Sequence, residues 1–156
     1  MTTVLDPVIA HHQQLLTDLT SLATAVHEAA RDGRDVGDPI AGLVRFVRAE
    51  LLPHAQAEEE TLYAAAVPIM ALGRFIDGML FEHQQLGDLC HDLAEVSDGL
   101  VAAETAHAML AVFAGHVRRE NEILLPALAE LPGVDLGGLI ADMHDAFTRE
   151  RAGAPA

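Results

Sequence analysis

Histidine is the residue type that stands out in this chain, because nine of its 156 residues are histidines and four of these interrupt rows of apolar residues. An imidazole can bind a metal or carry a proton near neutral pH, so this excess indicates metal or proton chemistry. Two of the four histidines are followed one helical turn later by a glutamate. Imidazole nitrogens and carboxylate oxygens together bind several transition metals. The candidate metal ligands are His12, His54, Glu58, His83, His116 and Glu120.

These candidates fall in rows of residues spaced three or four apart, the spacing of one helix face. The rows run Leu5, Val8, His12, Leu15, Leu19, Leu22 and Val26; Leu43, Val47, Leu51, His54, Glu58 and Leu62; Ile76, Leu80, His83, Leu86, Cys90 and Leu93; and Met109, Phe113, His116, Glu120, Ile123 and Ala127. Burying an unpaired charged group costs several kcal/mol, and a metal removes that cost by coordination. One inward histidine is more simply a hydrogen-bonded core residue, but the same interruption in four rows favours a metal centre.

The elements that must position these residues are four long helices and a short fifth one. Ala and Leu are abundant and aromatic residues are few, which favours helices over strands. Asp-Pro pairs at Asp6 and Asp38 mark helix starts. Long helices with short connections predict an all-α fold, an antiparallel up-down four-helix bundle in a single domain over 1–156. The predicted helices cover about 6–31, 38–66 with a kink at Pro53, 74–96, 100–128 and 135–149, with a connection from Pro68 to Gly73; the bundle spans about 5–130.

An internal repeat supports two metals rather than one. The stretch HHQQL from His11 is echoed by EHQQL from Glu82, and HAQAEEETL from His54 is echoed by HVRRENEIL from His116. Each half of the chain thus supplies one lone histidine and one His-x-x-x-Glu pair. Two such hairpins would meet about a pseudo-twofold axis, for which two metal ions are the natural number.

Two further histidines test this interpretation. His11 is the rival of His12 as first ligand, but its helical neighbours are Pro7, Gln14 and Asp18, whereas those of His12 are Val8, Leu15 and Leu19. We therefore expect His12 to face inward. His91 and Glu95 repeat the His-x-x-x-Glu spacing on a polar face beside Gln84 and Asp88. We expect this pair to be exposed to solvent, so position decides and spacing alone does not.

The composition limits the partners of the protein. A net charge of −15 with nine Lys and Arg argues against nucleic acid and anionic membranes as partners. No stretch resembles a membrane span and the N-terminus does not resemble a signal peptide. A single cysteine, Cys90, fits a reducing compartment. We expect a cytoplasmic protein, monomeric or a small homo-oligomer, whose partner is a small molecule.

The motifs AHHQQL, LLPHAQAEEETLY, FEHQQL and HVRRENEILLPAL resemble those of the hemerythrin-like, or HHE cation-binding, family over about residues 5–130. The order of motifs, H, HxxxE, H, HxxxE, is similar to that of an actinobacterial type. The resemblance implies a non-haem di-iron site, oxo- or hydroxo-bridged. It implies that His12 and His54 bind one iron and that His83 and His116 bind the other. Glu58 and Glu120 would bridge the two irons.

One position departs from the oxygen-carrying members of that family. These members place a second histidine one turn after the first on the third helix, where this chain has Gly87. His91 lies about 12 Å along the helix from His83 and cannot replace it. Each iron then keeps an open position, unless Glu50, Glu59 or Tyr63 fills one.

Open positions on both metals favour turnover over storage. We expect catalase-like decomposition of hydrogen peroxide, with Glu58 and Glu120 holding the redox-active pair. The alternative is non-enzymatic binding, sensing or storage of O₂, nitric oxide or iron by the same site. A ferritin-like oxidase needs two Glu-x-x-His motifs, and only Glu104 and His107 have that spacing. A metal-free helical interaction domain is the remaining class.

Overall fold

The computed structural model describes residues 4–69 and 72–154, and every regular element within them is helical. The elements are α1 (Asp6–Arg31), α2 (Gly37–Phe46), η1 (Val47–Leu51), α3 (Leu52–Glu58), η2 (Glu59–Tyr63), α4 (Ala64–Ala66), α5 (Gly73–Glu95), α6 (Gly99–Arg119), η3 (Glu120–Leu124), α7 (Leu125–Ala129) and α8 (Leu136–Gly153). The segments from α2 to α4 form one continuous rod, as do those from α6 to α7. The predicted connection at 68–73 includes residues 70–71, and the predicted domain includes 1–3 and 155–156; these lie outside the described residues.

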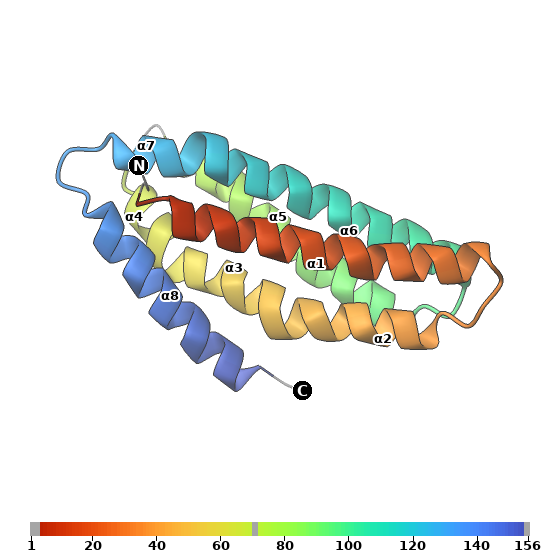
Figure 1. Cartoon of the computed structure of the whole chain (residues 1–156). Helices are drawn as coiled ribbons and strands as arrows, with labels where there is room; N and C mark the ends of the chain where they lie inside the picture. Colours follow the sequence, from red (N-terminus) through yellow and green to blue (C-terminus); the bar gives the residue numbers. More distant parts are fainter. Residues whose placement is uncertain (1–3, 70–71, 155–156) are drawn as a thin grey trace.

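Four rods lie side by side and alternate in direction, and α8 runs across one flank of the bundle (Figure 1). The rods are α1, α2 to α4, α5, and α6 to α7; α8 packs against α3 and η2. The predicted all-α bundle with a short fifth helix is confirmed. Predicted helix ends agree with the observed ones to within a few residues, because the loop residues that mark them are strong helix terminators.

Two helices begin in different ways: α8 has a side-chain N-cap, and α1 has a proline in its first turn. The Asp135 side chain accepts a hydrogen bond from the Gly138 amide (3.0 Å), so Asp135 is the N-cap of α8. The first helix begins at Asp6, as predicted, but Leu5 occupies its N-cap and no side chain caps it. Pro7 still lies in the first turn, where its missing N–H costs no hydrogen bond.

Three π-helical segments, η1, η2 and η3, interrupt the rods and were not predicted from the sequence. Two of them end two residues before a proline, η1 before Pro53 and η3 before Pro126. A proline has no N–H and its ring clashes with the carbonyl four residues earlier, and a wider turn relieves both problems. The predicted kink at Pro53 is therefore a π turn, and the rod continues through it.

The π segment η3 also shifts the inward face of its helix, which corrects the predicted row. Ile123 is 48% exposed, whereas Leu124 is buried, because a π turn contains one residue more than an α turn. The third predicted row has one similar error, since Leu80 is 36% exposed and Met79 is buried instead. The first and second rows keep their inward direction.

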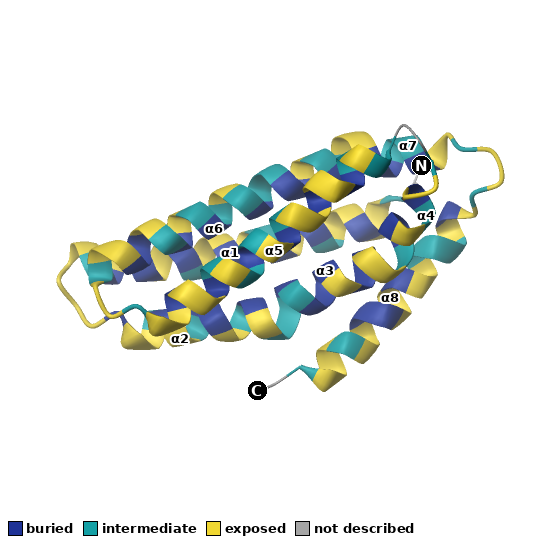
Figure 2. Cartoon of the chain, turned by 180° about the vertical axis from the view of Figure 1, so that it is seen from behind, coloured by how far each residue is buried: buried dark blue, intermediate teal, exposed yellow. Residues whose placement is uncertain are grey.

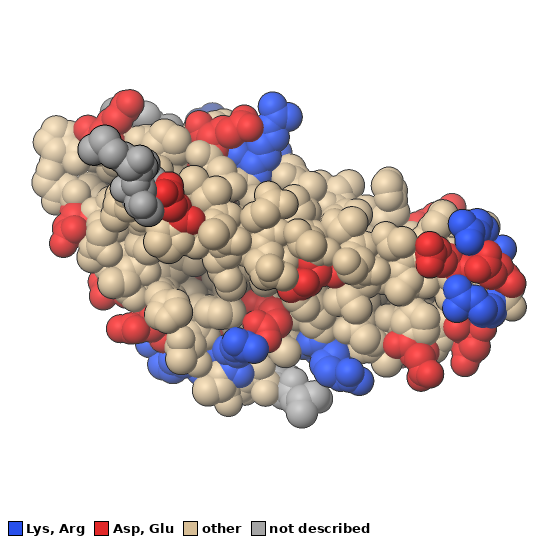
Figure 3. Space-filling view, viewed as in Figure 1, with Lys and Arg blue, Asp and Glu red and all other residues tan. Residues whose placement is uncertain are grey.

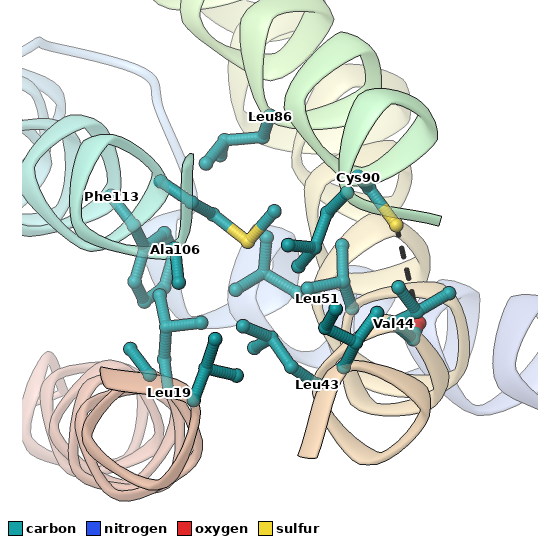
Figure 4. Packing of buried hydrophobic residues seen from close by; sticks show 14 of the residues in the cluster. Leu19, Leu43, Val44, Leu51, Leu86, Cys90, Ala106 and Phe113 are labelled. Atoms are coloured by element: carbon teal, nitrogen blue, oxygen red, sulfur yellow. Dashed lines mark hydrogen bonds between the residues drawn. The ribbon is translucent and has the colours of Figure 1, made fainter. Parts of the chain in front are cut away.

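The apolar core is divided into two clusters, with buried faces turned inward along all four rods (Figure 2). One cluster fills the end where α1 meets α2, and Leu19, Leu43, Leu86 and Phe113 interlock there (Figure 4). The other, at the α8 end, includes Leu62, Ile76, Leu124 and Phe147. The boundary between the clusters is where the candidate ligands lie: on α1, for example, His12 stands between Val8 of one cluster and Leu15 of the other.

One rod resembles a membrane span by length and composition, although no such stretch was predicted from the sequence. The run Gly99–Ala129 is long and apolar enough to cross a membrane by length and composition, with a mean hydropathy of 1.4. Core helices of bundles pass the same test, and here Met109 and Phe113 are buried against the other rods. On the face drawn in Figure 3, acidic groups are scattered, and basic groups lie beside them where α1 meets α2, as in the Arg31–Asp32 pair.

Candidate metal centre

The six predicted ligands meet in one buried layer across the bundle. His12 comes from α1, His83 from α5 and His116 from α6, while Glu120 opens η3. α3 supplies the remaining pair one turn apart. None is more than 6% exposed, and among the described residues they are the only histidines and acidic residues that are buried: His12, His54, Glu58, His83, His116 and Glu120.

Their side chains form two groups that share Glu58. His12, His54 and Glu58 form one group, and Glu58, His83 and His116 form the other. Within each group the possible ligand atoms lie within 4.8 Å of one another. Each group therefore offers two imidazole nitrogens and one carboxylate oxygen to a single cation. This division matches the pairing that the sequence resemblance implies.

Glu120 lies between the same two groups from the opposite helix. Its Oε2 is 3.6 Å from His12 Nε2 and 3.5 Å from His116 Nε2, so it faces one histidine of each group. Glu58 likewise has Oε1 3.0 Å from His54 Nε2 and Oε2 3.5 Å from His83 Nε2. Both carboxylates are thus placed to be shared by two metals, although their role as bridges stays a prediction.

Several buried polar atoms in the layer make no hydrogen bond of normal geometry, although some of them lie within ion-pair distance of a neighbouring side chain. They are both ring nitrogens of His54 and the Oε2 atoms of Glu58 and Glu120. Buried polar groups in proteins are nearly always satisfied, and leaving such atoms unpaired is costly. Nitrogen and carboxylate oxygen are suitable donors for iron, manganese or zinc. The residues present therefore fit a pair of bound cations.

Hydrogen bonds on the outer ring nitrogens aim three of the histidines at the centre. His12 Nδ1 donates to Asn121 Oδ1 (2.8 Å) and His83 Nδ1 donates to Glu59 Oε1 (2.8 Å). His116 Nδ1 donates to Glu82 Oε2 (3.0 Å) in the same way. Such partners fix the tautomer and leave Nε2 free to bind a metal. Asn121 and Glu82 were not found from the sequence, although each stands next to a predicted ligand.

Tyr63 is the one of the three candidate extra ligands that reaches the middle of the layer. Its hydroxyl donates to Glu120 Oε1 (2.5 Å) and lies 3.3 Å from His116 Nε2. Burial, with the Glu58 and Glu120 carboxylates, raises the pKa of Tyr63 far above its usual value, so the phenol stays protonated. Glu59 contacts an outer nitrogen instead, and Glu50 pairs with Arg151 at 2.6 Å.

Charge pairing dominates the electrostatics of the layer. Burial favours the neutral form of Glu58, but His54, His12 and His83 outweigh it and hold the pKa of Glu58 well below its usual range. Burial lowers the pKa of His12, yet the hydrogen bond to Glu58 and the charge of Glu120 raise it to about 9. Without a metal, imidazolium ions thus neutralise the carboxylates, and an entering cation takes the place of those protons.

His11 and His91 lie outside both groups. The His11 ring sits 4.8 Å from the His54 ring and 5.0 Å from the Phe147 ring. Burial and the neighbouring histidines His54 and His12 lower the pKa of His11 to about 4. His91 and Glu95 are exposed on α5, as predicted. His12 therefore has the ligand geometry that His11 lacks, and the ligand role itself stays a prediction.

The two adjacent histidines give a direct test of that role. Replacing His12 with glutamine is expected to lower the metal content from two ions per chain to one or fewer, because one group loses a nitrogen donor. The variant His11→Gln is expected to retain both ions, because its ring belongs to neither group. Elemental analysis after reconstitution and desalting measures the difference. A loss of metal in His11→Gln with full loading of His12→Gln would reverse the assignment.

Comparison with known proteins identifies the family. The family model described as the hemerythrin HHE cation binding domain matches residues 3–128, most of the chain. No curated protein and no solved structure matches the chain significantly. The matched range covers all four rods except the last residue of α7, and it contains both His/Glu groups, which are groups that a cation-binding domain requires. The chain therefore belongs to the hemerythrin HHE cation-binding domain family.

Proposed function

We propose that the chain holds two iron ions, one in each His/Glu group, with Glu58 and Glu120 shared, and that the loaded protein decomposes hydrogen peroxide. The observation that carries the proposal is the small number of donors on each side. Each group supplies two histidines, and Gly87, one turn after His83, has no side chain to add a third. A metal site that keeps an open position is one that can act on a small ligand.

A cleft with both polar and apolar lining, the latter from Leu52, Ala55 and Leu80, leads to one side of the layer. It has a volume of about 620 Å³ and reaches His83, which forms part of its lining. Gln56, Glu59, Glu60 and Gln84 line it as well. Hydrogen peroxide is a small polar molecule that these side chains can hydrogen-bond, so the cleft supports peroxide as the substrate.

The reaction consumes two molecules of peroxide. One loses two electrons and two protons and leaves as O₂; the other takes them up and leaves as two molecules of water. Bound iron would supply the store for these electrons. Glu59, whose Oε1 lies beside His83 at the cleft, is placed to accept and return a proton. Tyr63 holds Glu120 in place through its short hydrogen bond and keeps its own proton.

Oxygen release is the test of this function. The iron-loaded protein is expected to release one O₂ for every two molecules of peroxide consumed, measured with an oxygen electrode. The metal-free protein and an equal concentration of free iron serve as controls. Peroxide consumed at the rate of free iron, or consumed without O₂, would contradict the proposal.

Reversible binding of O₂ or nitric oxide is the second candidate, and an apolar pocket favours it. The pocket, of about 660 Å³, lies between α1 and α8 and is lined by Val8, Met143, Phe147 and His11 among others. The His11 ring lies 4.8 Å from the His54 ring, so the pocket ends beside the other metal position. An apolar gas would partition into such a space. A spectrum of the reduced, loaded protein that changes reversibly with O₂, without peroxide turnover, would favour this function.

A further inference from the structure

We propose that the two metal positions are unequal: the one between His83 and His116 binds its cation more tightly, and has the lower reduction potential, than the one between His12 and His54. The inference rests on the proposed two-iron centre and goes beyond it. It assigns Glu59 and Glu82 as the positioning residues that create the difference.

Both histidines of the first position have an anionic outer partner. Glu59 Oε1 accepts from His83 Nδ1 at 2.8 Å, and Glu82 Oε2 accepts from His116 Nδ1 at 3.0 Å. A carboxylate on the outer nitrogen of a metal-binding histidine makes the inner nitrogen a stronger donor. Stronger donors and nearby negative charge stabilise a ferric ion more than a ferrous one, so the reduction potential falls.

The histidines of the second position have no anionic outer partner. His12 Nδ1 donates to the neutral amide oxygen of Asn121, at 2.8 Å. His54 Nδ1 is buried without any hydrogen-bond partner. The centroid of the His54 ring lies 4.8 Å from that of the His11 ring and 6.1 Å from that of the Phe147 ring. A cation here is held by weaker donors and receives less negative charge from its surroundings.

The internal repeat shows that the difference lies at matching positions. In the repeat, Glu58 corresponds to Glu120, so the next residues, Glu59 and Asn121, correspond to each other. Their contacts correspond too, because Glu59 accepts from His83 and Asn121 accepts from His12. The pseudo-twofold arrangement therefore conserves this hydrogen bond but changes the charge of the acceptor.

The residues beside His116 and His54 also differ in charge, and again only the first metal position has a carboxylate there. His11 and Glu82 correspond in the repeat, each just before the lone histidine of its half. Glu82 binds the outer nitrogen of His116, while His11 only packs near the ring of the matching His54. Arg119 pairs with the other oxygen of Glu82 and so fixes the carboxylate while withdrawing part of its charge. The Glu82 side chain is only 18% exposed, so solvent screens the remaining charge little.

Stepwise loading of the metal-free protein with ferrous iron, without oxygen, tests the inequality. One equivalent of ⁵⁷Fe is expected to give mainly one Mössbauer doublet, and the second equivalent a different one. A redox titration of the fully loaded protein is expected to show two separate one-electron steps. The double variant Glu59→Gln, Glu82→Gln is expected to weaken the tighter site about 10- to 100-fold, to raise the lower potential and to bring the two doublets to equal filling.

The exchange Asn121→Glu is the matched counterpart, because it places on His12 the charged acceptor that His83 has. It is expected to tighten the weaker site, whereas a purely structural role for these residues predicts weaker binding in every variant. Equal filling and equal potentials in the unaltered protein would overturn the inference and leave the two-iron proposal standing. Fewer than two irons per chain would overturn both.

Discussion

Replacing Glu58 with glutamine is expected to remove both metal ions at once. Among the residues that the structure describes, only Glu58 belongs to both His/Glu groups, and its two oxygens face different histidines, His54 and His83. A neutral amide in its place supplies one weak oxygen donor, removes a negative charge from both metals and leaves nearby imidazolium ions unpaired. We expect the metal content to fall from two ions per chain to nearly none, by elemental analysis, with loss of peroxide turnover.

The control for this variant is Glu95→Gln. Glu95 follows His91 with the same spacing as Glu58 follows His54, but both His91 and Glu95 are exposed. This variant is expected to bind metal as the unaltered protein does. Breaking a buried ion pair can cost about 3–5 kcal/mol, so circular dichroism must show that Glu58→Gln is folded. If it is not, Glu58→Asp keeps the charge and shortens the reach. A variant at Glu58 that is folded and still holds two ions would contradict the shared role.

If the centre decomposes peroxide as proposed, replacing Gly87 with histidine is expected to convert it from turnover to binding. Gly87 lies one turn after His83, on the same side of α5, and a Cβ added there would meet no atom within 4 Å. An imidazole at this position can supply a third nitrogen to the metal held by His83 and His116. With that position closed, we expect peroxide turnover to fall roughly tenfold or more, because an open coordination position is what a metal needs to act on a substrate.

The matched control is Gly87→Ala, which adds the Cβ without a ligand. Alanine is favoured over glycine inside a helix by about 1 kcal/mol, so this variant is expected to be slightly more stable and to keep its peroxide activity. Oxygen release and the spectrum of the loaded protein measure both variants. If Gly87→His released O₂ as fast as Gly87→Ala, the open position at His83 would not be the site of reaction.

The sequence predicted the helices and the composition of the buried layer well, for a physical reason. A polar residue in an apolar row is costly, so rows interrupted by His and Glu at the same depth had to meet. The positions of the π segments could not be predicted, because a row of apolar residues does not reveal where a turn widens. Ile123 was therefore placed in the inward row, whereas within η3 the structure buries the next residue, Leu124, instead.

The outer partners of the histidines were also missed. Glu82 and Asn121 are polar residues beside predicted ligands, and on a helix such residues are usually solvated. Only the side-chain contacts show that Glu82 turns to His116 and Asn121 to His12. The signal was present in the internal repeat, which aligns Asn121 with Glu59, but a repeat shows correspondence and does not show which atoms touch.

The division of the core into two apolar clusters has a consequence for how the protein resists proteases. Between Leu15 and Val8 on α1, and at the same depth on the other rods, the clusters are joined by charged groups instead of by packed hydrocarbon. The free energy of metal binding would then add to the free energy of folding. Without metal, the end of the bundle beside α8 is expected to open more easily. Proteases act on such partly opened chains. If the layer binds metal as proposed, the metal-free protein is therefore expected to be cleaved faster by a protease than the loaded protein.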